Sequence, residues 1–221
     1  MFLLNFCGGL HVKKNKHSQW FFRWGQRYLL KKAFHQLNVL HHTPTAPVLI
    51  VVNHSNFYDS LVLFELEQQN LLPNSVVAVM DKAGLDKHKL FNGLGVVPVS
   101  TPMKLSEYKQ LISLMKQHSL LIFPQGKEEH IEKRPFSIEK GAASLLLKNP
   151  HHGILFVSLY YSYGAKPKGE IACRMLHIKA MDRPHELQDI QHFIETTMTA
   201  EVDHLKEDVI MKKFDSYTEL W

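Results

Sequence analysis

Short apolar runs rich in Val, Ile and Leu alternate with stretches of helical periodicity along most of this chain. Residues 48–52 and 154–161 form the most continuous runs, and each has the length and residue content of a buried strand. Residues 104–117, by contrast, place their apolar side chains on one side of a helix. Strands that alternate with helices pack as layers around a largely parallel sheet. The sequence therefore predicts an α/β fold with a mixed, mostly parallel sheet flanked by helices.

Turn-forming residues divide the chain into predicted elements. Pro44, Pro73 and Gly126 stand at the ends of apolar runs or helical stretches. A chain of 221 residues without an internal repeat is long enough for one sizeable core. We expect strands at residues 48–52, 75–80, 96–99, 120–123, 154–161 and 171–178. We expect helices at residues 18–40, 58–69, 104–117, 138–148 and 188–209, with a short helix inside the loop 81–95.

Positive charge is concentrated near the beginning of the sequence. The first 58 residues contain seven Lys or Arg side chains and no Asp or Glu. The whole chain carries +5, so the remaining residues carry the balance of −2. A basic segment joined to a nearly neutral body predicts a polyanionic partner, either membrane headgroups or nucleic acid. The seven cations are Lys13, Lys14, Lys16, Arg23, Arg27, Lys31 and Lys32.

Aromatic side chains such as Trp20, Trp24 and Tyr28 are interspersed among these cations. The combination is typical of a helix at a membrane surface, where rings lie at headgroup depth and cations meet anionic lipid. Two alternatives remain open: the aromatic face packs on the core, or the rings stack on a single-stranded nucleic acid. No recognised nucleic-acid motif follows. We therefore expect membrane lipids as a partner and no nucleic acid.

Long apolar runs, paired cysteines and metal-binding spacings are absent from the sequence. No apolar run approaches the roughly 18 residues that suggest a spanning helix. Cys7 and Cys173 form no motif, which favours a reducing, cytosolic setting. The 15 histidines show no H-E-x-x-H or similar spacing. We expect no metal, and a peripheral or monotopic location on the cytoplasmic face of the cell membrane.

The motif N-H-S-N-F-Y-D at residues 53–59 is the strongest candidate for catalytic chemistry. It lies where a buried strand ends and a helix begins, the position at which α/β sheets collect their ligands. His54 can act there as a general base, because imidazole titrates near working pH. Asp59 can accept a hydrogen bond from one ring nitrogen and leave the other free. In the structural alternative, Asn53 or Ser55 caps the helix and Asp59 pairs with the helix dipole.

Two further motifs come later in the chain. F-P-Q-G-K at residues 123–127 follows a predicted strand, and Gly126 permits close approach of the backbone to a ligand. P-F-S-I-E-K-G-A at residues 135–142 opens a helix, whose N-terminal amides favour anions or developing negative charge. Each motif is weak by itself, and their order after residues 53–59 carries more information than either alone.

Taken in order, the motifs resemble those of the glycerolipid acyltransferases, typified by bacterial 1-acylglycerol-3-phosphate acyltransferase. N-H-x4-D is followed by G-x-x-P-V at residues 95–99, then by F-P-x-G, P-F-x-x-x-K-G-A and an apolar strand. The resemblance spans residues 45–165. It implies an enzyme that moves a fatty acyl group from an acyl-CoA or acyl carrier protein thioester to a hydroxyl of a lipid acceptor. It also implies His54 as base, Asp59 as its orienting partner, and neither a cofactor nor a covalent acyl-enzyme.

The basic, aromatic beginning of the chain is similar to the membrane-anchoring segment of that family. We therefore divide the chain into a membrane-associating helical segment at residues 1–42 and an acyltransferase domain at residues 43–221. The expected partners are then membrane lipids and a thioester of acyl carrier protein or CoA.

The sequence departs from the family pattern where relatives grip the phosphate of their acceptor. The usual F-P-E-G-T-R-S has Gln125, Lys127 and Glu128 in place of its Glu, Thr and Arg. Ser100 and Thr101 stand where the family usually has a second Arg. An Arg suits phosphate because its planar fork binds two oxygens. The residues expected to bind the acceptor are Gln125, Gly126, Lys127 and Arg134.

Two kinds of acceptor remain open. Lys127, Lys133 or Arg134 can rebuild a phosphate site, in which case the acceptor is a lysophospholipid such as 1-acylglycerol-3-phosphate. Otherwise Gln125 hydrogen-bonds an uncharged acceptor, such as a glycolipid or glycosylated terpenoid, while Glu128 repels phosphate. Outside acyl transfer, the alternatives are a non-catalytic lipid-binding protein and a hydrolase. A hydrolase normally shows a G-x-S-x-G nucleophile elbow, which this sequence lacks.

Overall fold

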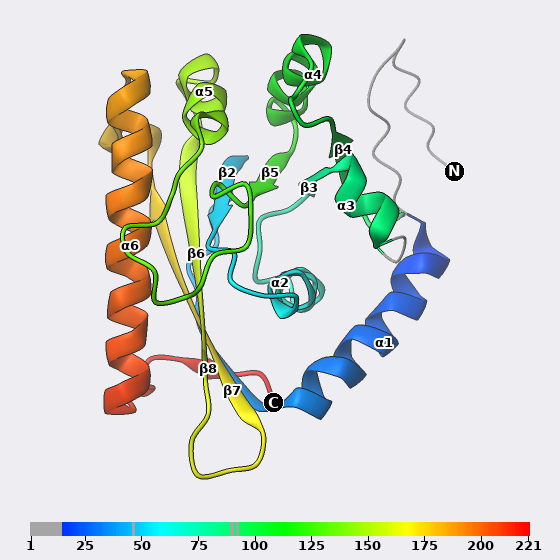
Figure 1. Ribbon diagram of the computed structural model, residues 1–221, viewed down its shortest axis with the longest axis vertical. Coiled ribbons are helices and arrows are strands. Elements are labelled where there is room, and N and C mark those ends of the chain that lie inside the picture. Colours follow the sequence, from blue (N-terminus) through cyan, green and yellow to red (C-terminus); the bar gives the residue numbers. More distant parts are fainter. Residues whose placement is uncertain (1–14, 46, 89–90, 92) are drawn as a thin grey trace.

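The computed structural model describes residues 15–45, 47–88, 91 and 93–221, and these residues build one eight-stranded sheet (Figure 1). The strand order is β4-β3-β5-β2-β6-β7-β1-β8. The pairs β6–β7 and β1–β8 are antiparallel and the other five are parallel, which confirms the predicted mixed, mostly parallel sheet. The strands are β1 (Phe34–Leu40), β2 (Val48–Val52), β3 (Val76–Asp81), β4 (Val96–Val99), β5 (Ser119–Ile122), β6 (Gly153–Ser162), β7 (Gly169–Ile178) and β8 (Thr218–Glu219).

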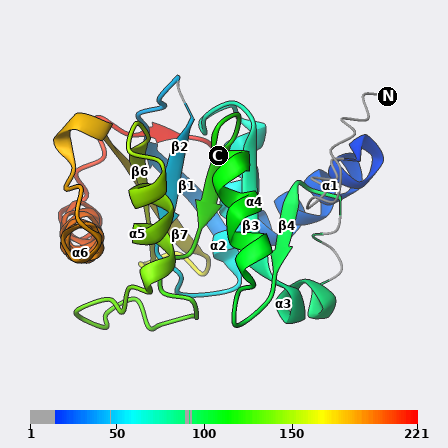
Figure 2. The ribbon, with the colours of Figure 1, turned by 90° about the horizontal axis from the view of Figure 1, so that it is seen from above.

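Helices cover both faces of the sheet, as predicted. In Figure 1, α6 lies to the left of the sheet, and α1 and α2 lie to the right. Seen from above, α1 and α6 lie at opposite ends of the molecule (Figure 2). The helices are α1 (Lys16–Ala33), α2 (Tyr58–Gln68), α3 (Lys82–Lys87), α4 (Leu105–Met115), α5 (Lys140–Lys148) and α6 (Leu187–Met211), with a 3-10 turn η2 (Ala180–Asp182).

Strand β2 lies inside the sheet and is buried on both faces. Val48, Ile50 and Val52 pack in a hydrophobic cluster with side chains of α1 and α2. Leu49 and Val51 point the other way and pack with side chains of α4, α5 and α6. This two-sided burial explains why the strand is a continuous apolar run. Because β5 and β6 run parallel to β2 on either side, the carboxyl ends of all three strands meet at one edge.

The helix expected at residues 18–40 is too long. α1 ends at Ala33, and the chain continues without a loop into β1. Leu37 and Val39 are fully buried, and β1 pairs in parallel with β7. Pairing with β7 satisfies the backbone groups of this segment and outweighs its helical pattern. The other expected strands and helices are confirmed, with ends that lie within two residues of the predicted ones.

Helix α1 buries one side and exposes a row of aromatic rings. Phe22 and Leu30 pack in the core. Trp20, Trp24 and Tyr28 follow one another at intervals of four residues and are 59%, 68% and 66% exposed. These three rings therefore do not contribute to the core. Among the described residues, no helix is both long enough and apolar enough to cross a membrane.

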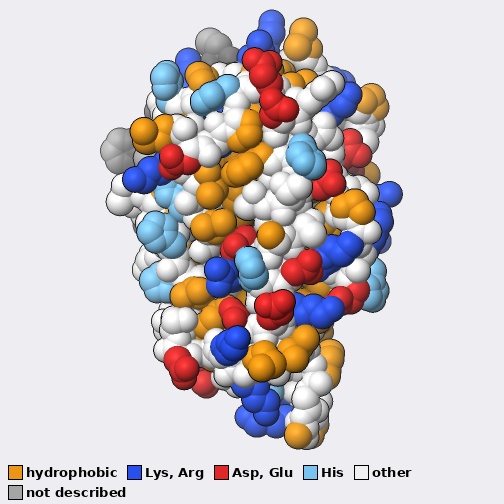
Figure 3. Space-filling view, turned by 90° about the vertical axis from the view of Figure 1, so that its left-hand side faces the viewer, with side chains coloured by type: hydrophobic (Ala, Val, Ile, Leu, Met, Phe, Trp, Pro, Cys, Tyr) orange, Lys and Arg blue, Asp and Glu red, His pale blue; other side chains and the backbone are white. Residues whose placement is uncertain are grey.

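The side of the molecule that carries α6 has a mixed surface (Figure 3). Acidic, basic, histidine and apolar side chains are interspersed over it. Ion pairs fasten the helix to its neighbours: Arg174 on β7 pairs with Glu201, and Lys206 pairs with Glu132. This arrangement is that of a solvated outer helix, in agreement with the polar composition of α6.

Candidate active site

The carboxyl end of β2 is tied to β6 by one asparagine. Asn53, which is fully buried, donates from Nδ2 to the carbonyl oxygen of Leu159 at 3.0 Å and accepts from the Leu159 amide at 2.8 Å. The side chain thus replaces two backbone partners at the point where β2 stops. Asn53 is therefore not a helix cap, and it fixes where the next residue, His54, leaves the sheet.

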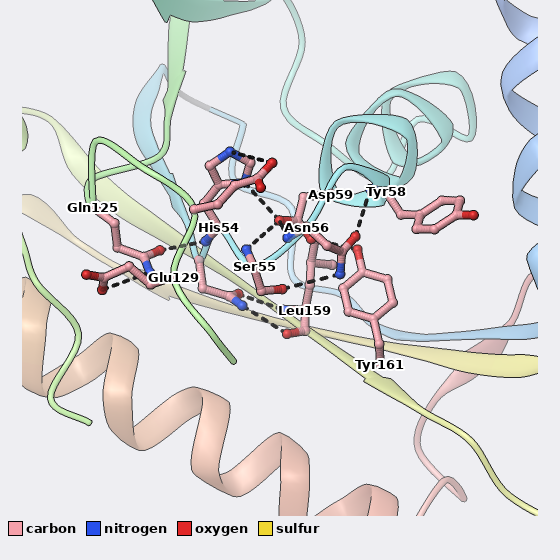
Figure 4. A network of polar contacts seen from close by, with 11 residues as sticks. His54, Ser55, Asn56, Tyr58, Asp59, Gln125, Glu129, Leu159 and Tyr161 are labelled. Atoms are coloured by element: carbon pink, nitrogen blue, oxygen red, sulfur yellow. Dashed lines mark hydrogen bonds and ion pairs between the residues drawn. The ribbon is translucent and has the colours of Figure 1, made fainter. Parts of the chain in front are cut away.

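His54 and Asp59 form the predicted pair. His54 Nδ1 lies 2.9 Å from Asp59 Oδ2, and the Asp59 side chain is fully buried (Figure 4). The same carboxylate oxygen accepts from the amides of Ser55 and Asn56 at 2.7 and 3.0 Å. The other, Oδ1, accepts from the Tyr161 hydroxyl at 2.7 Å. A buried carboxylate needs such partners, and here the chain supplies four donors.

The orientation of the imidazole leaves Nε2 available for chemistry. Nδ1 faces the Asp59 carboxylate, so Nε2 is the ring nitrogen that remains free to meet a ligand. The ring of Phe123 stacks on the imidazole, with ring centroids 4.1 Å apart and an angle of 19° between the planes. The stacking restricts rotation of the ring, so the free nitrogen keeps one direction.

The loop that follows β5 is fastened to the backbone of His54. The His54 amide donates to Gln125 Oε1 at 2.6 Å, and the Glu129 amide donates to the His54 carbonyl at 2.9 Å. Gln125 is 1% exposed, so its carboxamide holds the histidine instead of meeting a ligand. The expected contact between Gln125 and the acceptor is therefore not supported by its position.

Glu129 stabilises the loop that follows β5, and the sequence analysis did not predict a role for it. It is buried, pairs with Lys133 Nζ, and accepts from the Ser137 amide at 3.2 Å. Burial raises the pKa of Glu129, but the hydrogen bonds from Lys133, Ser137 and Gln125 outweigh it and bring the pKa to about 2. The ionised carboxylate uses Lys133, so this cation is engaged within the loop.

Gly126, Lys127 and Glu128 form the part of the loop that borders a cavity. Gly126 has φ of +71°, which a residue with a side chain rarely adopts. The Gly126 amide donates to the Phe123 carbonyl at 3.1 Å, so this N–H group is already hydrogen-bonded within the loop. Glu128 is 60% exposed and places Oε1 3.8 Å from His54 Nε2.

Arg134 does not join the other predicted residues. Its Nε and Nη2 donate to Asp203 on α6 at 2.9 and 2.5 Å, and Nη1 donates to the Ile131 carbonyl at 2.6 Å. The guanidinium also lies over the ring of Phe136, 4.6 Å from its centroid. The structure therefore brings together His54, Asp59, Gln125, Gly126 and Lys127, and it directs Arg134 toward α6.

The second expected phosphate position, at residues 100–101, contains a compact polar network. Glu107 accepts from Lys82 Nζ at 2.5 Å and from the Ser100 amide at 2.9 Å. The Lys82 hydrogen bond, followed by that of the Ser100 amide, lowers the pKa of Glu107 to about 2. Thr101 donates to Asp81 at 2.7 Å. Lys82, which also bonds Ser100, is thus paired with a carboxylate.

An apolar cavity of about 550 Å³ opens beside the histidine. His54, Phe123 and Gly126 line it at the carboxyl end of the sheet. Among the described residues, the charged side chains along the lining are four carboxylates and two ammonium groups. Most other lining residues are apolar, and they include Leu63, Phe64, Ala78, Phe91, Leu94, Leu111 and Leu145. An apolar cavity of this size suits a long hydrocarbon chain more than a small polar molecule.

The comparisons with known proteins agree with this geometry. A family model described as Acyltransferase matches residues 32–162, which is more than half of the chain. The chain belongs to the acyltransferase family. The matched part of this acyltransferase contains the His54–Asp59 pair and the loop that fastens His54. The match supports an acyl-transferring enzyme over the non-catalytic alternative.

A solved structure supports the fold of the acyltransferase. It is the crystal structure of the 1-acyl-sn-glycerophosphate (LPA) acyltransferase PlsC from Thermotoga maritima. The two chains share 14% of their residues and superpose with a TM-score of 0.64, over 85% of this chain and 79% of the other. At this identity the likeness establishes the fold. A comparison with curated protein sequences gave no match.

Several residues of the acyltransferase site carried no signal of their own in the sequence. Phe123 stood inside a motif without an assigned role, and Asn53 was considered only as a helix cap. Glu129 lay in the charged loop, and Tyr161 at the end of a predicted strand. Their partners depend on which strands become neighbours, and sequence spacing does not determine that.

Proposed function

We propose that this acyltransferase moves a fatty acyl group from a thioester to a hydroxyl of a lipid acceptor, with His54 as general base and Asp59 as its orienting partner. The observation that carries the proposal is the contact of a fully buried Asp59 with His54 Nδ1, beside an apolar cavity that His54 also lines. A base with a fixed tautomer next to a hydrocarbon-sized space fits a lipid acyl transfer.

The proposed chemistry needs no group covalently attached to the protein. Nε2 of His54 takes the proton of the acceptor hydroxyl as its oxygen attacks the thioester carbonyl. The tetrahedral intermediate collapses, the carbon–sulfur bond breaks, and the imidazolium returns its proton to the departing thiolate. The products are an ester and a free thiol, so atoms and charge balance without an acyl-enzyme.

The acyl donor is a thioester of CoA or acyl carrier protein, taken as a co-substrate. Both donors present the same thioester to His54. The apolar lining of the cavity supports a hydrocarbon chain in it, since each buried methylene contributes about 0.8 kcal/mol.

The charges of the cavity favour a neutral acceptor over lysophosphatidate. Lys133 is paired with Glu129, and Arg134 with Asp203, so neither supports a rebuilt phosphate site. Among the described residues of this loop, Lys127 is the cation that lines the cavity. The charged side chains of the lining are Glu67, Asp81, Lys87, Lys127, Glu128 and Glu139. An excess of carboxylates disfavours a dianionic headgroup.

Helix α1 is proposed to hold the enzyme peripherally on the cytoplasmic face of the membrane. Trp20, Trp24 and Tyr28 form an exposed aromatic row, and the neighbouring Arg23 and Lys31 are exposed as well. Rings of this kind lie at headgroup depth, and cations add attraction to anionic lipid. This arrangement supports membrane lipids as the partner of the first helix.

A direct transfer assay tests the proposed function. Purified enzyme on anionic vesicles receives acyl-CoA or acyl carrier protein thioester together with lysophosphatidate, a monoacylglycerol or an alkyl glucoside. We expect acceptor-dependent formation of the acylated lipid, followed by mass spectrometry. Release of free fatty acid at an equal rate with and without acceptor would mean hydrolysis and would contradict the proposal.

A further inference from the structure

The loop residue Glu128 is held near the reacting nitrogen by the backbone. His54 bonds through its amide to Gln125 and through its carbonyl to the amide of Glu129. Glu128 immediately precedes that fastened amide, so its Cα has a set position relative to His54. These two hydrogen bonds hold the backbone of Glu128 close to His54, and its side chain extends from there to within 3.8 Å of the imidazole.

The carboxylate of Glu128 borders the place where the acceptor hydroxyl must lie. Oε1 is 3.8 Å from Nε2, too far for a hydrogen bond between the two. A hydroxyl that gives its proton to Nε2 has to approach from the cavity, which both residues line. Among the described residues, no Lys or Arg forms an ion pair with Glu128. Its side chain is 60% exposed, so a ligand at this spot can reach its oxygens.

We propose that Glu128 selects the acceptor by accepting a hydrogen bond from a second hydroxyl, next to the one that His54 deprotonates. The proposal rests on the function proposed above and narrows its acceptor to a neutral headgroup with two neighbouring hydroxyls, as in a sugar or in glycerol. Hydroxyls on adjacent carbons are about one hydrogen-bond length apart, so one can reach Nε2 while the other reaches Oε1.

The same carboxylate disfavours an anionic headgroup. A phosphate attached next to the reacting carbon occupies the space of the second hydroxyl and faces Glu128 at close range. Two negative charges a few ångströms apart repel, and the apolar lining of the cavity reduces screening by water. One residue thus adds a contact for a diol and a penalty for a phosphate, which is how specificity arises from both attraction and repulsion.

Three acceptors with the same hydrocarbon chain separate these effects. A 1-monoacylglycerol offers two neighbouring hydroxyls, a long-chain alcohol offers one, and lysophosphatidate offers one beside a phosphate. The relative kcat/KM for the three is measured with the full-length enzyme, Glu128→Ala and Glu128→Gln. Glu139→Gln is the control, because Glu139 is another carboxylate of the same cavity, and its side chain lies beside Gly126.

We expect the enzyme to prefer the monoacylglycerol. In Glu128→Ala its kcat/KM falls roughly tenfold, the order of one lost hydrogen bond to a charged group. In the same variant kcat/KM for the alcohol is unchanged and kcat/KM for lysophosphatidate rises. Glu128→Gln also raises kcat/KM for lysophosphatidate. Glu139→Gln shifts the ratios much less, which separates a local contact from the total charge of the cavity. Melting temperatures verify that each variant is folded.

Two results would overturn the inference while leaving acyl transfer in place. One is a preference for lysophosphatidate that Glu128→Ala and Glu128→Gln leave unchanged. The other is an equal loss for all three acceptors, which would mean that Glu128 acts through His54 and not on the headgroup. Transfer to none of the three acceptors by the unmodified enzyme would overturn both this inference and the proposed function.

Discussion

The hydroxyl of Tyr161 donates a hydrogen bond of 2.7 Å to Asp59 Oδ1, on the side of the carboxylate that faces away from His54. Tyr161 lies near the end of β6, 102 residues after Asp59, and its ring packs on that of Phe34. Burial, together with the charge and hydrogen bond of Asp59, raises the pKa of Tyr161 well above its usual value. The phenol therefore stays a donor throughout any practical assay range.

Removing the Tyr161 hydroxyl tests whether its hydrogen bond to Asp59 supports the His54–Asp59 pair. Tyr161→Phe leaves Asp59 with three donors, and we expect kcat to fall roughly tenfold with a loss of about 1–2 kcal/mol in stability. Tyr163→Phe is the matched control, because Tyr163 is close in sequence but 72% exposed. Turnover and urea unfolding are measured on both variants. Equal behaviour of the two would show that the Tyr161 hydroxyl does not support the site.

The two members of the dyad should fail in different ways. His54→Ala should lower turnover roughly 10²- to 10⁴-fold, the usual share of a general base, with little change in melting temperature. Asp59→Asn should lower turnover by a similar factor through the wrong tautomer. It should also destabilise the fold, because an amide group then faces backbone donors from Ser55 and Asn56. Near-normal turnover in His54→Ala would disprove the mechanism.

The cavity should determine the length of the acyl chain. Ala78→Leu on β3 adds bulk to the cavity lining, so the preferred donor should become shorter. Each excluded methylene should lower kcat/KM by about fourfold, the equivalent of about 0.8 kcal/mol. Ala83→Leu on α3 is exposed and serves as the control. A series of acyl-CoA donors of increasing length gives the profile, and an unchanged profile in Ala78→Leu would place the chain elsewhere.

The exposed rings of α1 should carry membrane attachment. Replacing Trp20, Trp24 and Tyr28 together with Ala should reduce binding to anionic vesicles, as measured by co-sedimentation. The remaining binding should weaken as salt rises, since each nearby cation contributes about 1 kcal/mol. Met181→Ala, at an exposed apolar residue of η2, controls for general loss of apolar surface. Equal binding of the triple variant and the unmodified protein would rule out this surface.

Acid should destabilise the enzyme through two carboxylates. Hydrogen bonding to Lys82 brings the pKa of Glu107 to about 2, and hydrogen bonds to Lys133 and Ser137 overcome burial and do the same for Glu129. Both pKa values lie below the usual 4.5 of a glutamate. The stabilisation is therefore complete above about pH 4.5 and disappears as the pH falls toward 2. Free energies of unfolding measured across this window should depend less on pH in Glu107→Gln and Glu129→Gln. An unchanged slope in both would refute these pairings.

The order of strands and helices was predictable because the local pattern of apolar residues indicates each element. A continuous apolar run such as β2 and an amphipathic stretch such as α4 differ in period, and period survives in any context. The end of α1 was not predictable in this way. Phe34–Leu40 becomes a strand because β7 lies beside it, and the sequence near Ala33 contains no turn residue to mark the change.

The His54–Asp59 pair was predictable because its contact is local, and the approach of residues 125–127 was predictable only from the order of the family motifs. His54 and Asp59 are five residues apart, so one loop and the start of one helix bring them together. Arg134 was expected at the acceptor because it follows the loop closely in sequence. Its guanidinium instead meets Asp203 on α6, and nothing in the spacing of the two residues indicates that pairing.

Helix α1 continues directly into β1, so no flexible linker separates the helix from the sheet. A helix joined by a flexible linker could bind a bilayer while the rest of the protein tumbled freely. Here Ala33 is followed at once by Phe34 in the sheet, and α2 packs along α1. Once the aromatic row of α1 rests on a surface, the tilt of the whole enzyme is set. Removal of residues 1–42 would take away β1 together with α1, so it would disrupt the sheet and would not isolate the contribution of α1 to membrane binding.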